Sequence, residues 1–147
     1  MDLKKYKNEL RNNNLTETLK SLSDIELSML EGTIYRTDIE GDNEKILSAI
    51  LTETEYREND LHNFRLNIRE EQKKLLYQLA NYGLTDYLKR YKDRELRAIL
   101  DAYSSDDIEG DILSIFMVIN DELQYRFEDI MKKQKKELEK TYSKIKG

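Results

Sequence analysis

The pentapeptide Asp-Ile-Glu-Gly-Asp occurs twice in this chain, at residues 38–42 and again, 69 positions later, at residues 107–111. The same offset pairs further identical residues without a gap: Lys4 with Lys73, Leu10 with Leu79, Asn12 with Asn81, Leu15 with Leu84, Thr16 with Thr85, Leu19 with Leu88, Lys20 with Lys89, Asp24 with Asp93, Glu26 with Glu95, Leu27 with Leu96, Ile50 with Ile119, Tyr56 with Tyr125 and Arg57 with Arg126. Self-similarity in one constant register indicates a duplicated structural unit. We therefore predict a tandem duplication, with one helical repeat over 1–69, a second over 70–138 and a helical C-terminal tail over 139–147.

The spacing of apolar residues predicts an all-α fold. The chain has no proline and five glycines, and its apolar residues recur at intervals of three and four. We expect about four helices in each repeat. Because 147 residues are typical of one domain, the two repeats are predicted to share one core as a pseudo-symmetric helical bundle. An extended, solenoid-like arrangement is the alternative.

Capping residues mark where these helices begin. A first helix over residues 3–10 is expected to stop at the asparagines of 12–14, and Thr16 and Thr85 are predicted to cap a short second helix. Ser23 and Glu26 have capping-box spacing, which predicts a third helix over 24–35. Each Asp-Ile-Glu-Gly-Asp motif is interpreted as a helix-to-helix turn, with Gly41 and Gly110 at positive φ and the following aspartates as N-caps.

The stretch after the first turn predicts a long helix that links the repeats. No glycine or proline occurs between Asp42 and Gly83, and apolar residues continue at helical spacing. The helix is either continuous or broken near Asn59 and Asp60, where the residues are weak helix formers. The last helix is predicted to run through Leu138 to Tyr142.

Composition restricts the classes of protein to which the chain could belong. The absence of cysteine excludes disulfides and thiolate metal sites, and neither a secretion signal nor a membrane-spanning run is visible, so we expect a cytoplasmic protein. The net charge of −5 disfavours direct binding of nucleic acid, which relies on clustered Lys and Arg. The basic segment from Lys132 to Lys146 is interleaved with glutamates and is interpreted as a solvated helix end.

Motifs for catalysis, metal or cofactor binding are absent from the sequence. His62 is the only histidine, and no serine has a motif that would supply a base. The acidic turn resembles a calcium loop only superficially, because Asn43 and Ala49 occupy the positions where such a loop needs Gly and Glu. We therefore expect no enzymatic activity, no metal and no cofactor.

The duplicated polar residues are the best candidates for a partner-binding surface. They combine the two acidic turns, the second of which lies in a stretch without any basic residue between Arg97 and Arg126, with two Tyr-Arg pairs of a kind enriched at interface hot spots. The predicted residues are Asp38, Glu40, Asp42, Tyr56, Arg57, Asp106, Asp107, Glu109, Asp111, Tyr125 and Arg126. The competing interpretations are a solvated acidic face, Glu40 paired with a local cation such as Arg36, and a buried arginine paired with an acid of the opposite repeat.

The resulting hypothesis is a non-enzymatic regulator that presents an acidic surface to a protein with a basic one. In its most specific form the chain is an inhibitor that occupies the nucleic-acid channel of its target, as antagonists encoded by phages or mobile elements do. The alternative is a structural protein that homo-oligomerises through its long helices, which heptad-like spacing over residues 116–138 would suit.

Overall fold

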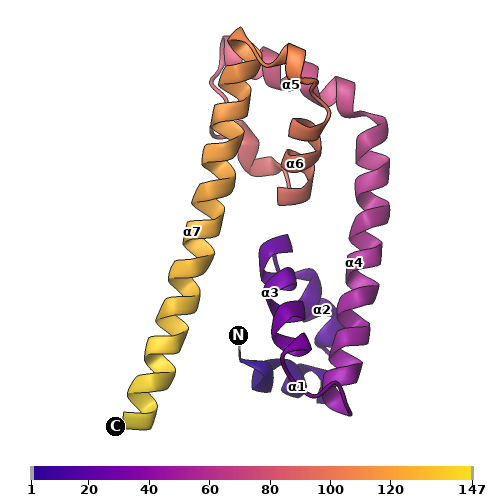
Figure 1. Cartoon of the computed structure of the whole chain (residues 1–147), viewed down its shortest axis with the longest axis vertical. Helices are drawn as coiled ribbons and strands as arrows, with labels where there is room; N and C mark the ends of the chain where they lie inside the picture. The colour runs from indigo at the N-terminus through magenta and orange to yellow at the C-terminus, as the bar shows by residue number, and fades with distance from the viewer. Residues whose placement is uncertain (1, 147) are drawn as a thin grey trace. The chain divides into compact units, whose positions relative to one another are not determined.

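The computed structural model describes the backbone of residues 2–146 and the side chains of residues 2–145. Within this range the protein is all-α, with seven α-helices, two short 3₁₀-helices and no strand (Figure 1). The chain forms two compact units, Met1–Asn67 and Ile68–Gly147. The predicted all-α class is confirmed, whereas the tandem duplication and the sharing of one core by the two repeats stay predictions.

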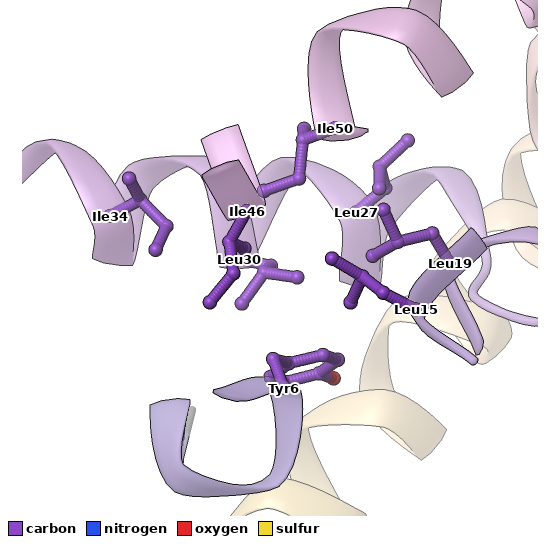
Figure 2. Close-up of a cluster of buried hydrophobic side chains, with 8 residues drawn as sticks. All are labelled: Tyr6, Leu15, Leu19, Leu27, Leu30, Ile34, Ile46 and Ile50. Carbon is purple, nitrogen blue, oxygen red and sulfur yellow. The ribbon is translucent and has the colours of Figure 1, made fainter. Parts of the chain in front are cut away.

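Unit 1 contains four helices arranged around a core of leucine and isoleucine. They are α1 (Leu3–Arg11), α2 (Leu15–Lys20), α3 (Asp24–Tyr35) and α4 (Asp42–Leu66), and α4 packs against the other three. Figure 2 shows the side chains that converge in this core: Tyr6, Leu15, Leu19, Leu27, Leu30, Ile34, Ile46 and Ile50. Burying each such side chain contributes about 1.5–3 kcal/mol. This packing stabilises α1 and α2, which are too short to be stable alone.

The predicted start of α3 is confirmed, whereas the predicted start of α2 is wrong. The backbone N–H of Glu26 donates to Ser23 Oγ and the N–H of Ser23 donates to Glu26 Oε1, both at 3.1 Å, so the predicted capping box is confirmed. The Thr16 prediction was wrong, because Asn14 holds the N-cap position of α2. Asn13 already reverses the chain with φ 58°, so the helix begins before the threonine. The Thr85 prediction was also wrong, because the next residue, Asp86, holds the N-cap position of the element that follows.

Unit 2 contains three α-helices and two 3₁₀-helices. The elements are α5 (Ile68–Asn81), η1 (Tyr87–Arg90), α6 (Asp93–Asp101), η2 (Ser105–Asp107) and α7 (Gly110–Lys146). The predicted short second helix is thus a 3₁₀ turn in this unit. Its buried apolar side chains come from all of these elements except η2 and from the loops beside η1: Leu75, Leu84, Leu88, Tyr91, Leu96, Ala98, Ile99, Ile115, Ile119 and Ile130. Helix α7 extends past Tyr142 to Lys146, which confirms the predicted long final helix.

The predicted continuous linking helix is not formed, because the helix breaks at Asn67. Asn59 and Asp60, the predicted alternative break, lie inside α4. At the end of α4 the N–H of Asn67 donates to the carbonyl of Phe64 at 3.1 Å, which is a tightened i−3 bond. Asparagine competes with helical bonding through its own side chain, so it suits a helix end.

Both repeated turns place glycine where an L side chain would be strained. Gly41 has φ 57° and ψ −122°, and the N–H of Asn43 donates to the carbonyl of Glu40 at 3.2 Å, as in a type II′ turn. Gly110 has φ 54°, and Ile112 donates to Glu109 at 3.1 Å. The predicted turn and positive φ are confirmed. The predicted N-caps Asp42 and Asp111 were wrong, because both lie in the first turn of their helices, beyond these glycines.

We expect Gly41→Ala to lower the free energy of unfolding by about 1–3 kcal/mol, because φ is positive there although nothing lies near the added Cβ. Gly32→Ala is the matched control. Gly32 lies within α3 with equal space around its Cβ, so alanine should stabilise the protein by about 0.5–1 kcal/mol. Urea unfolding followed by circular dichroism measures both, and equal effects would contradict the strain argument.

Candidate functional site

The Arg57 side chain joins three helices of unit 1. Its Nε donates to Glu53 Oε1 on the same helix at 2.9 Å, and its Nη1 donates to Asp24 Oδ1 in the first turn of α3 at 2.9 Å. Its Nη2 donates to the carbonyls of Leu19 at 3.1 Å and Leu22 at 2.7 Å. Leu19 lies in the last turn of α2, and its carbonyl also accepts the backbone N–H of Leu22 at 3.1 Å. We call Asp24, Glu53 and Arg57 the arginine clamp of unit 1.

Arg126 makes three of the corresponding bonds in unit 2. Its Nε donates to Glu122 Oε1 at 3.0 Å, its Nη1 to Asp93 Oδ1 at 2.7 Å and its Nη2 to the carbonyl of Leu88 at 3.1 Å. Each acceptor lies 69 positions after its counterpart in unit 1. Lys89 adds an ion pair to Glu122 at 3.2 Å. Asp93, Glu122 and Arg126 form the arginine clamp of unit 2.

These bonds satisfy the predicted arginines inside their own units. The acid that pairs with each arginine comes from the same unit, so the expected pairing with the opposite repeat was wrong. Burial opposes the charge of Arg126, but its bonds to Asp93 and Glu122 outweigh this and raise the pKa of Arg126 above its ordinary value. The side chain of Arg57 is 8% exposed, so it offers little surface to a partner.

The acidic residues of both turns are at the surface. Asp38, Glu40, Asp106, Asp107, Glu109 and Asp111 are exposed, and Asp42 is half-buried. Two of the aspartates have local partners: Asp42 pairs with Arg11 at 3.3 Å, and Asp107 Oδ2 accepts from Ser104 Oγ at 2.8 Å. The carboxylates of Glu40 and Glu109 bind no partner among the described residues, Arg36 included. Helix capping therefore does not explain this repeated glutamate.

Tyr56 and Tyr125 are the exposed members of the two Tyr-Arg pairs. They are 64% and 60% exposed, whereas the adjacent arginines turn inward into the clamps. The ammonium of Lys89 lies 5.0 Å from the centre of the Tyr125 ring, within cation–π range. Each tyrosine therefore presents a ring edge and a hydroxyl at the surface.

The predicted residues do not form one compact patch in either unit. Tyr56 follows Asp42 by 14 residues on one helix, and Tyr125 follows Asp111 by the same interval. At 1.5 Å per residue each tyrosine lies about 21 Å along the helix axis from its acidic turn. Each unit thus carries two separate exposed features, an acidic turn and a tyrosine.

Sequence reasoning missed a polar cluster that is found in unit 2 alone. The Tyr91 hydroxyl donates to Glu71 Oε2 at 2.5 Å, and Lys74 Nζ donates to Glu71 Oε1 at 3.1 Å. Burial and the bond to Glu71 raise the pKa of Tyr91. Burial, followed by the charge of Asp107, raises the pKa of Tyr103. A comparison of residues 69 positions apart could not have revealed the Tyr91 cluster, because Leu22 occupies the position equivalent to Tyr91.

The described residues include an open groove but no cluster of metal ligands. They contain no group of three or more His, Cys, Asp or Glu side chains that could hold a metal ion. A groove of about 260 Å³ lies between α2 and α4, with Lys45 and Ser48 in its lining, but it is open and smaller than ordinary ligand pockets. Among the described helices, none is long and apolar enough to cross a membrane.

No protein-family model matches the sequence, and no curated protein and no solved structure is similar to the chain.

We expect Arg57→Met to lower the free energy of unfolding by about 3–5 kcal/mol, because it leaves two largely buried carboxylates without their cation. Arg126→Met should cost less, since its side chain is 19% exposed. The exposed Arg36→Met is the control and should change stability by at most about 0.5 kcal/mol. Adding Asp24→Asn and Glu53→Gln to Arg57→Met should recover part of the lost free energy of unfolding, because these changes remove the two carboxylate charges. An Arg57 variant as stable as the Arg36 control would rule out a structural role for the clamp.

We expect alkaline pH to destabilise the protein through Tyr91. Because the folded state raises the pKa of Tyr91, the stabilisation from its hydroxyl is complete below about pH 10 and declines above it, where the unfolded chain ionises first. Tyr91→Phe should lower stability at pH 7 by about 1.5–3 kcal/mol and should reduce the decline between pH 9 and pH 11. Urea unfolding at each pH measures both effects. The exposed Tyr77→Phe should leave the profile unchanged, and an unaltered Tyr91→Phe profile would contradict the assignment.

Proposed function

We propose that the chain is a non-enzymatic protein-interaction module whose acidic turns bind a basic surface on another protein. The observation that carries the proposal is the repeated glutamate of the turns. Glu40 and Glu109 are exposed at equivalent positions, and within the described part of the chain neither carboxylate has a hydrogen-bond or ion-pair partner. A turn needs the glycine but not this glutamate, so recognition of a cation on a partner gives a reason for the residue to be present twice.

The exposed tyrosines support the same proposal as a second contact point. Tyr56 and Tyr125 lie about 21 Å from the acidic turns of their units. A partner that reached both features in one unit would therefore cover an extended strip along α4 or α7. An inhibitor that fills the nucleic-acid channel of its target is the most specific form of this proposal, because such channels combine elongated shape with basic side chains. A cytoplasmic location remains part of the proposal.

We further propose that the two units arose as a tandem duplication. The arginine clamps and the glycine turns recur at the 69-residue offset, which supports this origin. Buried core positions recur at the same offset as well: Tyr6 and Leu75, Leu15 and Leu84, Leu19 and Leu88, Leu27 and Leu96, Leu30 and Ile99, Ile46 and Ile115, Ile50 and Ile119, and Leu61 and Ile130. A duplicated module would present two similar binding surfaces in one chain, which raises avidity for a partner with repeated basic sites.

Affinity purification from the native cell, followed by mass spectrometry, tests the interaction. We expect the wild-type chain to retain a partner that is released as salt rises, because exposed charge pairs are screened. The double variant Glu40→Lys and Glu109→Lys should retain at least tenfold less of it, since like charges would then face each other.

The matched control reverses two exposed glutamates away from the turns, Glu58→Lys and Glu139→Lys, and so changes the net charge equally. Retention should stay within about twofold of the wild type. If the turn variant and the control variant retain the partner equally, or if raised salt does not release it, the acidic turns are not the binding surface.

A further inference from the structure

Helix α7 carries a second apolar row besides the one buried in unit 2. The buried row includes Ile115, Ile119 and Ile130. The second row, which we call the outer seam, consists of side chains that are exposed or half-buried: Leu113, Met117, Phe127, Met131, Leu138 and Ile145. At 100° per residue the outer seam lies about 120° around the helix from the buried row. The core of unit 2 therefore does not cover it.

The outer seam has the spacing of a coiled coil. With the polar residues Asn120, Gln124, Gln134 and Thr141, its positions alternate strictly between steps of four and three from Leu113 to Ile145. This pattern lasts for more than four heptads and about 50 Å of helix, which is enough for a coiled coil. Among the described side chains of α7 beyond Ile130, residues 131–145, none is buried, and the helix runs on past α5 and α6 (Figure 1). The outer seam is therefore uncovered along this part of α7.

The two halves of α7 carry opposite charge. Residues 110–128 contain four acids and one arginine, for a formal charge of −3, whereas residues 129–146 contain seven lysines and three acids, for a formal charge of +4. A second copy of this helix in antiparallel orientation would set each acidic half against a basic half. A parallel second copy would instead set like charges together.

We propose that the outer seam is a self-association surface through which two copies of the chain pair by antiparallel contact of their α7 helices. A pairing centred on Asp129 sets Leu113 opposite Ile145 of the second copy and Phe127 opposite Met131. It also sets Gln124 opposite Gln134, and paired amides at one core layer specify register at a cost in affinity. The surface is separate from the acidic turns, so the pairing does not depend on the function proposed above.

Sedimentation of the full chain from roughly 1 µM to 1 mM tests the association. We expect the mass to rise from monomer to dimer and the dissociation constant to increase several-fold between low and high salt, because opposite charges attract across the antiparallel pair. Leu138→Glu should raise the dissociation constant at least tenfold. Ser143→Glu, which adds the same charge on another exposed face of this half of α7, should change it by less than threefold. A monomer throughout, or equal effects of the two variants, would overturn the proposal.

The orientation is testable because the chain contains no cysteine. An oxidised mixture of Leu113→Cys and Ile145→Cys chains should give disulfide-linked heterodimers, and neither variant should cross-link to itself. Both side chains are exposed, at 45% and 78%, so the substitutions spare the core. Self-linked Ile145→Cys dimers would show a parallel pair and would refute the antiparallel arrangement.

Discussion

The fold of each unit depends on one guanidinium group that connects three chain segments. Arg57 binds an acid at the start of α3, an acid on its own helix and carbonyls at the end of α2. Arg126 repeats this pattern. The apolar core would hold these short helices together in several similar arrangements, because dispersion and burial are non-directional. The planar guanidinium forms good hydrogen bonds to its three partners in only one relative placement of the segments that carry them. It therefore specifies the helix arrangement that the leucine core stabilises.

The acids and carbonyls around each clamp explain why the charged groups survive burial. Asp24 and Asp93 lie in the first turn of a helix, where the dipole favours negative charge. The Leu19 carbonyl lies in the last turn of α2, where it accepts the backbone N–H of Leu22 and still has a second lone pair for the guanidinium. The guanidinium therefore meets carboxylates at favourable positions and a carbonyl able to accept a further bond. This mutual satisfaction keeps the cost of removing the charges from water low.

The sequence predicted the helical class, the bounds of α3 and the glycine turns, because each depends on local pattern. It did not predict the break at Asn67, since Asn59 and Asp60 offer equally weak helix formers and only packing chooses among them. It located Arg57 and Arg126 but assigned their acids to the wrong repeat, because the offset between matching residues says nothing about which of two equivalent aspartates is nearer. It grouped Tyr56 and Tyr125 with the adjacent arginines as partner-binding candidates, and only the structure separates the two, because the arginines turn inward while the tyrosines are exposed.

The near equivalence of the clamps has a consequence for how the chain folds. Three of the four acceptors of Arg57 recur for Arg126 at the 69-residue offset, so the unfolded chain contains two similar sets of acceptors for either arginine. Misassembly between units is a characteristic failure in the folding of multidomain proteins. The side chains at one equivalent position differ: the Tyr91 hydroxyl binds Glu71 in unit 2, whereas Leu22 of unit 1 has no polar group in its side chain. Such a difference makes the surroundings of the two clamps unequal, although the clamps themselves are alike.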